Sequence, residues 1–194
     1  NGLDWAPSGN NLVVSLGTTV GGRSTLYTVS MGGGQTEMFA GSVIWSAMRP
    51  QFSANGQWLY FVGMTGPGDG QIWRAHADGS GLERVGTGTE QVKTVAPSPD
   101  GSRVAYARAS FTDPLQILTV ATGQVASFNV TTEGLHWSPT SARLSLRQIG
   151  GPATMNVDGT GFRTYTDYLG TDDPPAPWSP DGNWIAANRG MLEL

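Results

Sequence analysis

A short phrase recurs along this chain at nearly constant spacing, and it limits the possible folds more than any other feature. The phrase is an aromatic residue or proline, a serine or alanine, a turn, and then an alternating apolar run. Its copies begin at Trp5, Phe52, Pro97, Trp137 and Trp178, which lie 47, 45, 40 and 41 residues apart. A strand-like unit repeated every 40 to 50 residues, roughly, is typical of units that stack or form a ring. The sequence therefore predicts a repeat protein.

The third copy is the most regular and shows what one repeat contains. A β-branched run at 92–95 leads into the turn SPDG at 98–101. Proline presets φ there, aspartate can hydrogen-bond the backbone ahead of it, and glycine accepts a positive φ. Apolar and polar residues alternate at 102–108, as in a half-buried strand. Two further runs at 115–120 and 125–130 surround the tight turn ATGQ. One repeat thus predicts four short strands, A to D, joined by hairpins.

The other copies follow the same plan, and no stretch of useful length has the 3.6-residue period of a helix. Four-stranded antiparallel units of this period match the blades of a β-propeller. We therefore expect an all-β fold, with about four and a half blades in one domain, 1–194, and repeats starting near 3, 50, 92, 134 and 176. Strand C is expected at 25–30, 71–76 and 153–157, and strand D at 36–40, 82–86 and 162–166.

The last copy predicts an incomplete blade. Its expected strands are A at 176–178, B at 183–188 and a short C within 191–194, without a strand D. Open sheet edges of this kind are avoided in natural proteins. The pattern favours a piece of a larger propeller of about six to eight blades, with an unusual small ring that ends in a truncated blade as the alternative.

The motifs themselves carry a resemblance to a known family. WSPDG followed by an apolar pair, and the later IWRAHADG and LTVATG, resemble the TolB-like, WD-like propeller repeat of the SPDG class. The likeness is strongest at 97–106 and 178–187, and weakest after Trp137, where SPTSA lacks both the aspartate and the glycine. The resemblance implies a propeller fold and envelope-associated protein partners. The motif is a turn device, so it specifies the fold and says little about function.

Composition excludes several classes of protein. The net charge is −4, and Lys93 is the single lysine among eleven cationic residues, so no basic stripe exists for nucleic acid. The chain has no cysteine, which excludes disulfides, thiolate metal sites and a cysteine nucleophile. No apolar run approaches the ~20 residues of a membrane helix. A lysine-poor sequence rich in glycine, serine and threonine favours the periplasm or the cell exterior.

The sequence offers little for catalysis or metal binding. It has no G-x-S-x-G, H-E-x-x-H, EF-hand or P-loop pattern. His76 and His136 fall in different repeats and different strands, so each is interpreted as a structural histidine. We therefore expect no catalytic residue, no metal and no cofactor.

The loops, in contrast, vary from blade to blade. The A–B turn keeps its length, whereas the B–C and D–A loops, which share one face of a propeller, differ in length and content; variable loops on a rigid scaffold commonly carry function. The D–A carboxylates could attract a cation or a basic segment, although ordinary solvated charge is the favoured interpretation. The loop aromatics Trp45 and Phe111 belong to a residue type that often anchors a binding partner, although packing between adjacent blades is the alternative interpretation. Partner-binding candidates on this face are Trp45, Arg49, Arg108, Phe111, Glu90, Glu133, Asp172 and Asp173, with Arg23, Asp69, Asp113 and Arg147 also qualifying by position.

Taken together, these patterns favour a non-catalytic binding or scaffold propeller that recognises a protein or peptide on its B–C/D–A loop face. One alternative is the gating propeller of a larger enzyme, such as a prolyl-oligopeptidase-like peptidase. Another is a carbohydrate-binding or lyase-type propeller, so a small-molecule or glycan ligand stays open. The aromatic residues that open the phrase, Trp5, Phe52, Trp137 and Trp178, share one repeat position and are expected to pack between blades.

Overall fold

The fold was examined in a computed structural model of the chain. The structure describes residues 2–17, 22–89, 91–108, 112–132, 134–148, 151–165, 176–187 and 190–193, with the backbone alone described at 187 and 190–193.

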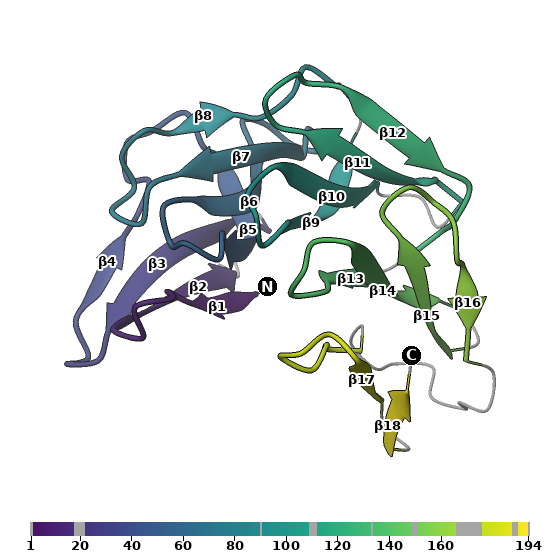
Figure 1. Ribbon diagram of the computed structural model, residues 1–194. Coiled ribbons are helices and arrows are strands. Elements are labelled where there is room, and N and C mark those ends of the chain that lie inside the picture. The colour runs from purple at the N-terminus through teal and green to yellow at the C-terminus, as the bar shows by residue number, and fades with distance from the viewer. Residues whose placement is uncertain are drawn as a thin grey trace.

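Four sheets of four antiparallel strands and one two-stranded sheet make up the described chain (Figure 1). In each complete sheet the strands pair in sequence order, so each sheet is one blade, and the predicted all-β propeller is confirmed. Blade 1 contains β1 (Leu3–Trp5), β2 (Asn11–Gly17), β3 (Ser24–Ser30) and β4 (Gln35–Glu37); blade 2 contains β5 (Ser46–Phe52), β6 (Leu59–Met64), β7 (Gln71–Ala75) and β8 (Glu83–Arg84); blade 3 contains β9 (Val92–Pro97), β10 (Arg103–Arg108), β11 (Leu115–Thr119) and β12 (Val125–Phe128); blade 4 contains β13 (Gly134–Trp137), β14 (Arg143–Gln148), β15 (Gly151–Asn156) and β16 (Arg163–Thr164).

Blade 5 is described as the hairpin β17 (Trp184–Ala187) and β18 (Gly190–Glu193). The A strand expected at 176–178 is reduced to a single antiparallel bridge between Trp178 and Ile185.

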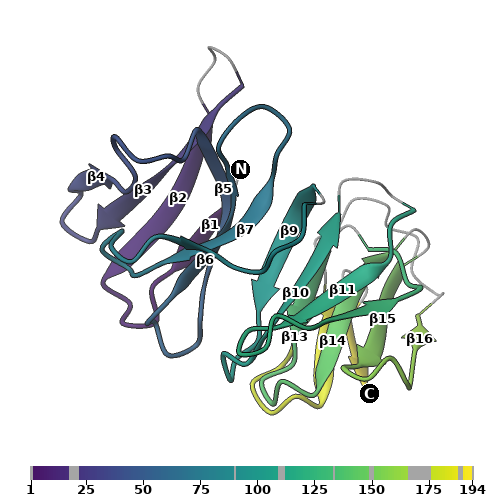
Figure 2. The ribbon, with the colours of Figure 1, turned by 90° about the horizontal axis from the view of Figure 1, so that it is seen from above.

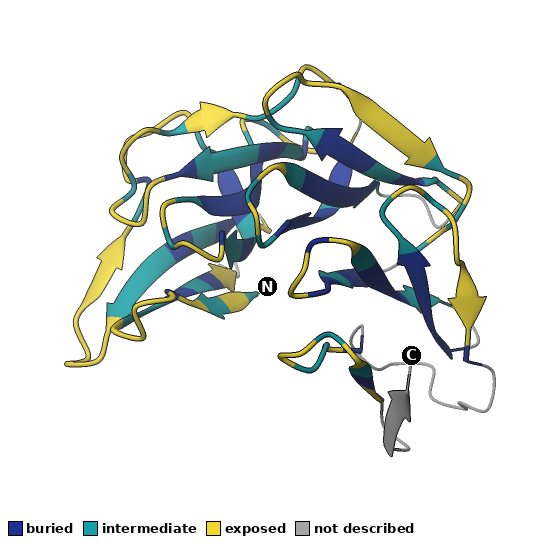
Figure 3. Cartoon of the chain, viewed as in Figure 1, coloured by how far each residue is buried: buried dark blue, intermediate teal, exposed yellow. Residues whose placement is uncertain are grey.

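The blades are arranged around a common centre with their A strands innermost (Figures 1 and 2). Burial decreases from the inner strands to the outer ones (Figure 3). Strand β6 is almost wholly buried, whereas every residue of β4, β8 and β16 is exposed. These outer strands are two or three residues long, shorter than the five predicted, because an edge strand has a neighbour on one side only.

One candidate residue is not where the sequence predicted it. Arg49 was expected in a D–A loop, but it lies within β5. The pairing of β5 with β6 shifts between Met48 and Gln51, which leaves Arg49 and Pro50 as a bulge. Arg49 has a φ of 54°, a left-handed conformation that residues other than glycine rarely adopt. The extra residues lengthen the inner strand, so the D–A loop before it ends earlier than predicted.

The repeated A–B turns are closed by a serine hydroxyl. In blades 2 to 5 this hydroxyl accepts the backbone N–H five residues later at 3.0 Å, which joins the two ends of the turn. In three of these turns it also donates to the side chain two residues later, which in turn accepts the backbone N–H two residues further on, as in an Asx turn. The serines are Ser53, Ser98, Ser138 and Ser179, and the three side-chain acceptors are Asn55, Asp100 and Asp181.

The fourth A–B turn departs from this pattern at Ser141. The other turns have a glycine at the equivalent place, as at Gly101 with a φ of 71°. Ser141 adopts the same left-handed conformation with a φ of 60°. Its side chain is buried, and its hydroxyl accepts the backbone N–H of Asp100 at 3.1 Å. The departure from the motif therefore provides a hydrogen bond between the turns of blades 3 and 4.

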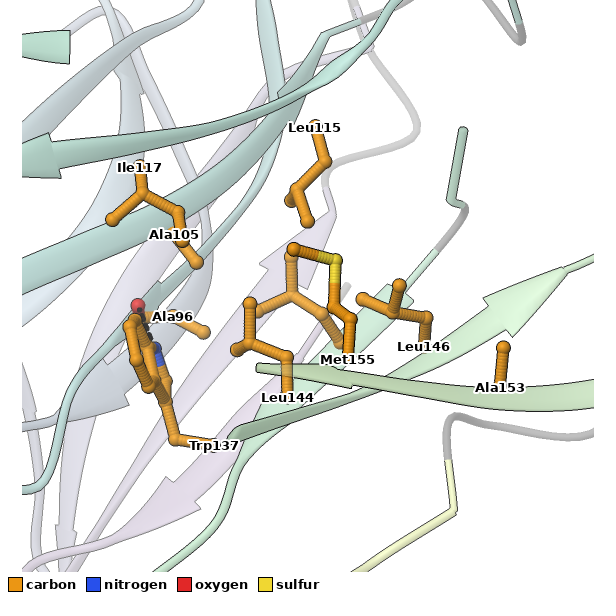
Figure 4. Packing of buried hydrophobic residues seen from close by; sticks show 10 residues of the cluster. Ala96, Ala105, Leu115, Ile117, Trp137, Leu144, Leu146, Ala153 and Met155 are labelled. Atoms are coloured by element: carbon orange, nitrogen blue, oxygen red, sulfur yellow. Dashed lines mark hydrogen bonds between the residues drawn. The ribbon is translucent and has the colours of Figure 1, made fainter. Parts of the chain in front are cut away.

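The core consists of layers between adjacent blades. Between blades 3 and 4, side chains from the inner three strands of each sheet form one buried cluster (Figure 4). Trp137 is buried in it, and its indole N–H donates to the carbonyl of Ala96 in the preceding blade at 2.9 Å. The cluster contains Ala96, Ala105, Leu115 and Ile117 from blade 3, and Leu135, Trp137, Leu144, Leu146, Ala153 and Met155 from blade 4.

The packing predicted for the repeated aromatic position holds at three blades and fails at the first. The indole N–H of Trp178 donates to the carbonyl of His136 in the preceding blade at 3.3 Å, just as that of Trp137 donates to the blade before its own. Phe52 packs against the cluster between blades 1 and 2. Trp5, in contrast, is 51% exposed. The difference follows from the fold, because within the described residues no blade lies before blade 1.

Candidate binding face

The antiparallel order of the strands places the β2–β3, β6–β7 and β10–β11 loops at the same end of the blades as the D–A connections. On this face Trp45 lies just before β5, half-buried, and its backbone N–H donates to Met64 at 2.7 Å. The guanidinium carbon of Arg23 lies 4.8 Å from the centre of the Trp45 ring, within reach of a cation–π interaction. Two residues predicted by position are therefore in contact between blades 1 and 2.

The remaining candidates are not brought together with this pair. Arg108 ends β10 in blade 3 and faces Asp113 across its own loop, with 3.6 Å between Nε and Oδ2. Arg49 lies in β5, as described above. Phe111, Glu90, Glu133, Asp172 and Asp173 lie outside the described residues, so the predicted carboxylate ring stays a prediction.

A hollow of about 250 Å³ opens at this end of blade 2, beside the β6–β7 loop. Asp69 closes that loop by accepting hydrogen bonds from the Thr65 hydroxyl at 2.6 Å and from the backbone N–H groups of Thr65 and Gly66. Slight burial raises the pKa of Asp69, but these hydrogen bonds outweigh it and hold the pKa below the usual 3.8. The hollow is lined by Thr65, Asp69, Gln71, Trp73, Arg84 and Thr89.

Close backbone approach fixes the β6–β7 loop against blade 3. Gly70 accepts the backbone N–H of Val92 at 2.8 Å, and a Cβ at Gly70 would lie only 2.7 Å from the Val92 carbonyl oxygen. The side-chain amide of Gln91 donates to the carbonyl of Gly68. The end of the loop that follows Asp69 is therefore held against blade 3 by backbone contacts, which fix the position of the loop beside the hollow.

A second hollow, of about 260 Å³, lies between blades 2 and 3 and shares Gln71 with the first. Its wall is mixed, with the apolar Ile72, Val85, Val92 and Leu118 beside the polar Thr87 and Gln116. Hollows that offer both polar and apolar groups suit a ligand with both kinds of group, such as a short peptide segment.

The two hollows carry polar groups that nothing described satisfies. The side-chain oxygen of Gln116, in the second hollow's lining, and the indole N–H of Trp73, in the first, are buried without a hydrogen-bond partner among the described residues. The strand pairings show that Trp73 and Gln116 occupy the same position of strand C in blades 2 and 3, because they pair with Phe61 and Tyr106 respectively. Buried polar groups left in this state are uncommon and call for an explanation.

Of the residues around the first hollow, the loop variation indicated Asp69 alone. Gln71, Trp73 and Arg84 belong to strands, and Arg84 becomes part of the site because it donates to the side-chain oxygen of Gln71 at 2.7 Å and to the carbonyl of Gly88. A sequence signal for them would have been the polar or aromatic residue at the strand C position shared by Trp73 and Gln116.

Both histidines have structural surroundings. The Nδ1 atom of His76 lies 3.1 Å from the carbonyl of Gln57, and its ring stacks on Trp58 with 4.3 Å between centres. Burial lowers the pKa of His136 from its usual 6.5. Within the ranges that the structure describes, no three His, Cys, Asp or Glu side chains form a group able to hold a metal ion, and no helix is long and apolar enough to cross a membrane.

Comparison with known proteins gives one sequence relative and many structures of the same fold. No family model matches the chain. An uncharacterized protein of Agrobacterium fabrum is 37% identical over 146 residues, which is 72% of this chain and 39% of that protein. The chain thus spans less than half the length of this curated relative.

Three solved structures superpose on nearly the whole chain. TolB from Acinetobacter baumannii has a TM-score of 0.71 at 15% identity, over 95% of this chain and 47% of TolB. A putative TolB from Agrobacterium tumefaciens has a TM-score of 0.73 at 19% identity, over 94% and 71%. Hydrazine synthase of Kuenenia stuttgartiensis has a TM-score of 0.70 at 14% identity, over 94% and 53%.

Identities this low show the fold alone, and the fold occurs both in TolB proteins and in a protein named as an enzyme. The repeated SPDG turns, the radially arranged four-stranded blades and these superpositions agree: the chain is a β-propeller with the TolB-like fold.

Proposed function

We propose that the chain is a non-catalytic binding propeller that recognises a protein or peptide on its B–C/D–A loop face. The observation that carries the proposal is the pair of hollows at blade 2, which share Gln71 and each combine polar with apolar lining residues. An extended peptide could place a polar side chain near Asp69 and Arg84 and an apolar one near Val85 and Leu118.

The opposite face supports the same proposal by contrast. Its carboxylates are used within their own turns: Asp78 and Asp158 accept hydrogen bonds from Ser80 and Thr160, and their pKa values are lowered by these bonds. Asp100 is engaged in the same way with Ser98. Turns that repeat the same internal hydrogen bonds from blade to blade offer little variety to a partner, so recognition is better assigned to the loops that vary in length and content.

The likeness to TolB proteins supports a scaffold or binding role, and we extend it to a protein partner and to a location in the periplasm or outside the cell. The enzyme-gating and carbohydrate-binding propellers are the alternatives to this proposal. The carbohydrate-binding alternative enters below as an outcome of the test.

The test is to select binding peptides from a random display library and to measure the affinity of one synthetic peptide by fluorescence anisotropy. Thr89→Trp fills the first hollow, and Thr36→Trp, at an exposed threonine of β4 that lines neither hollow, is the matched control. We expect Thr89→Trp to weaken binding by about tenfold or more, equivalent to a loss of ~1.4 kcal/mol, while the control stays near the original affinity.

Two results would contradict the proposal. Equal loss in both variants would place recognition elsewhere. A chain that selects no peptide yet binds an arrayed glycan would favour the carbohydrate-binding alternative.

A further inference from the structure

The outer edge of blade 3 is longer than that of the other complete blades. Strand β12 is the outermost strand of its sheet, and β11 is its single partner among the described strands. It is four residues long, whereas the outer strands of blades 1, 2 and 4 have three, two and two. Figures 1 and 3 show β12 on the outside of the molecule, exposed along most of its length. Blade 3 therefore presents a continuous sheet edge to solvent.

Strand β12 also lacks the charges that protect the other edges. Charged residues occur in each of the other three outer strands, namely Glu37 in β4, Glu83 and Arg84 in β8, and Arg163 in β16. Strand β12 reads VASF, and the chain has neither a charged residue nor a proline from 115 to 132. Natural proteins use charge, proline and short length to keep other strands from pairing with an edge. An edge without these features is suited to pairing with another strand.

Strand register shows which backbone groups of this edge face outward. The N–H of Thr119 donates to the carbonyl of Gln124 at 2.8 Å, and these two residues continue the register of β11 with β12. Hydrogen-bonded and non-hydrogen-bonded pairs alternate along an antiparallel ladder. Ala126 therefore bonds to β11, whereas Val125 and Ser127 point their N–H and C=O groups away from it. Two residues of β12 thus present both a donor and an acceptor to an incoming strand.

The same edge borders the second hollow. Residues that pair directly across two strands have their side chains on one face, so Val125 shares a face with its partner Leu118, and Gln116 lies on that face two residues away. All three residues line the second hollow, on the side of blade 2. Phe128, on the opposite face of β12, packs against the cluster between blades 3 and 4. A residue that paired with Val125 from outside would therefore point its side chain toward the hollow.

We propose that the peptide partner binds as a fifth strand of blade 3, paired with the outer edge of β12, and places an apolar side chain opposite Val125 at the second hollow. Strand addition of this kind takes its affinity from main-chain hydrogen bonds and its specificity from pockets for alternate side chains. The inference rests on the proposed function, which supplies a peptide partner, and adds how that peptide is held. The second hollow shares Gln71 with the first, so the added strand is continuous with the site described above.

The length of the edge favours a peptide over a second copy of the chain. Four residues of β12 span only ~13 Å. A stable contact between two folded proteins buries more than about 1,000 Å² in total, which an edge of this length does not supply. A peptide, in contrast, needs only the strand edge and the hollow beside it.

The test follows single backbone amides of the whole chain by hydrogen-exchange NMR, with and without a saturating synthetic peptide from the selection described above. We expect exchange at Val125 and Ser127 to slow by about tenfold or more, because their N–H groups gain acceptors on the added strand. The amide of Ala126, which already bonds to β11, should keep its rate and serves as the internal reference. This alternation is specific to strand pairing, and the measurement needs no variant.

A pair of variants tests the same contact through affinity. Ser127→Pro removes an outward N–H without breaking a bond to β11, and proline is tolerated at a strand edge. Ser127→Ala is the matched control, because it removes the hydroxyl and keeps the N–H. We expect Ser127→Pro to weaken peptide binding by about tenfold or more in fluorescence anisotropy, and Ser127→Ala to stay near the original affinity.

The possible failures separate this inference from the proposed function. A peptide that binds while exchange at Val125 and Ser127 stays unchanged would overturn the strand addition and leave the proposed function standing, and so would equal affinities of Ser127→Pro and Ser127→Ala. A chain that selects no peptide would overturn both proposals. Slower exchange at the two amides of the peptide-free chain as its concentration rises, with a doubled mass in light scattering, would make a second copy the occupant and overturn this inference alone.

Discussion

Replacing Ser141 separates two effects that the fourth A–B turn combines. The residue holds a left-handed φ of 60°, which disfavours any side chain, and its hydroxyl accepts the N–H of Asp100 from the neighbouring turn. Ser141→Ala keeps the unfavourable backbone conformation and removes the hydrogen bond. Ser141→Gly removes both at once. The difference between the two variants therefore reports the backbone cost.

The magnitudes can be worked from these contacts. A single hydrogen bond of this kind contributes about 1 kcal/mol, so Ser141→Ala should lower the free energy of unfolding by roughly that amount. The left-handed conformation costs a residue with a side chain about 1 to 2 kcal/mol. Replacing the side chain by glycine removes this cost, but the greater conformational freedom of glycine in the unfolded chain offsets about 0.5 to 1 kcal/mol of the gain. Ser141→Gly should thus be near the original stability, and about 1 kcal/mol above Ser141→Ala.

Thermal unfolding followed by circular dichroism measures this difference, because 1 kcal/mol corresponds to about 2 to 4 °C for a chain of this size. Gly101→Ala is the matched control: it introduces a side chain at a φ of 71°, where a Cβ would have open space and no hydrogen bond changes. It should lose about 1 kcal/mol. An alanine variant at 141 as stable as the glycine variant would refute the reasoning, because the backbone conformation would then carry no cost.

Two further predictions concern the loop face and the centre of the ring. Gly70→Ala should lower the free energy of unfolding by about 1 to 3 kcal/mol, because its Cβ would meet the carbonyl of Val92 at 2.7 Å. Hydrogen exchange should then show faster exchange of the Val92 amide proton. Gly32→Ala, whose Cβ would have a serine hydroxyl at 3.9 Å as its nearest contact, should leave that rate unchanged. Burial lowers the pKa of His136, so the unfolded chain takes up a proton below about 6.5 while the folded chain stays neutral, and the free energy of unfolding should fall as pH drops below that value. Denaturant unfolding at a series of pH values measures this fall. In His136→Gln the free energy of unfolding should depend less steeply on pH, and an unchanged pH dependence would contradict the assignment.

The inner part of each blade could be predicted from the sequence because its signals are local. The strand predicted at 102–108 is β10 at Arg103–Arg108, and the turn at 98–101 closes as the SPDG motif requires. The outer strands were predicted too long, since their residues have one neighbour strand and little burial to extend them. The bulge at Arg49 depends on how β5 pairs with β6, which no local pattern of β5 reveals.

The candidate site was less predictable than the fold because it combines loop residues with strand residues. The variable loops included Asp69, but the hollow also needs strand residues such as Gln71 and Arg84. Their joint position follows from the pairing of β7 with β8, which brings the Arg84 guanidinium within 2.7 Å of the Gln71 side-chain oxygen and depends on strand register rather than on a local motif. Similarly, the exposure of Trp5 depends on what lies beside blade 1 rather than on its motif.

The serine-closed turns also bear on the order of folding. The hydroxyl of Ser98 joins residues only five positions apart, so closing an A–B hairpin costs little chain entropy. The indole contacts between blades, by contrast, connect residues 41 and 42 positions apart, as in Trp137 with Ala96 and Trp178 with His136. Local contacts form faster than distant ones. The hairpin of each blade is therefore a nucleus that every repeat supplies for itself, and docking between blades follows as a later and slower step.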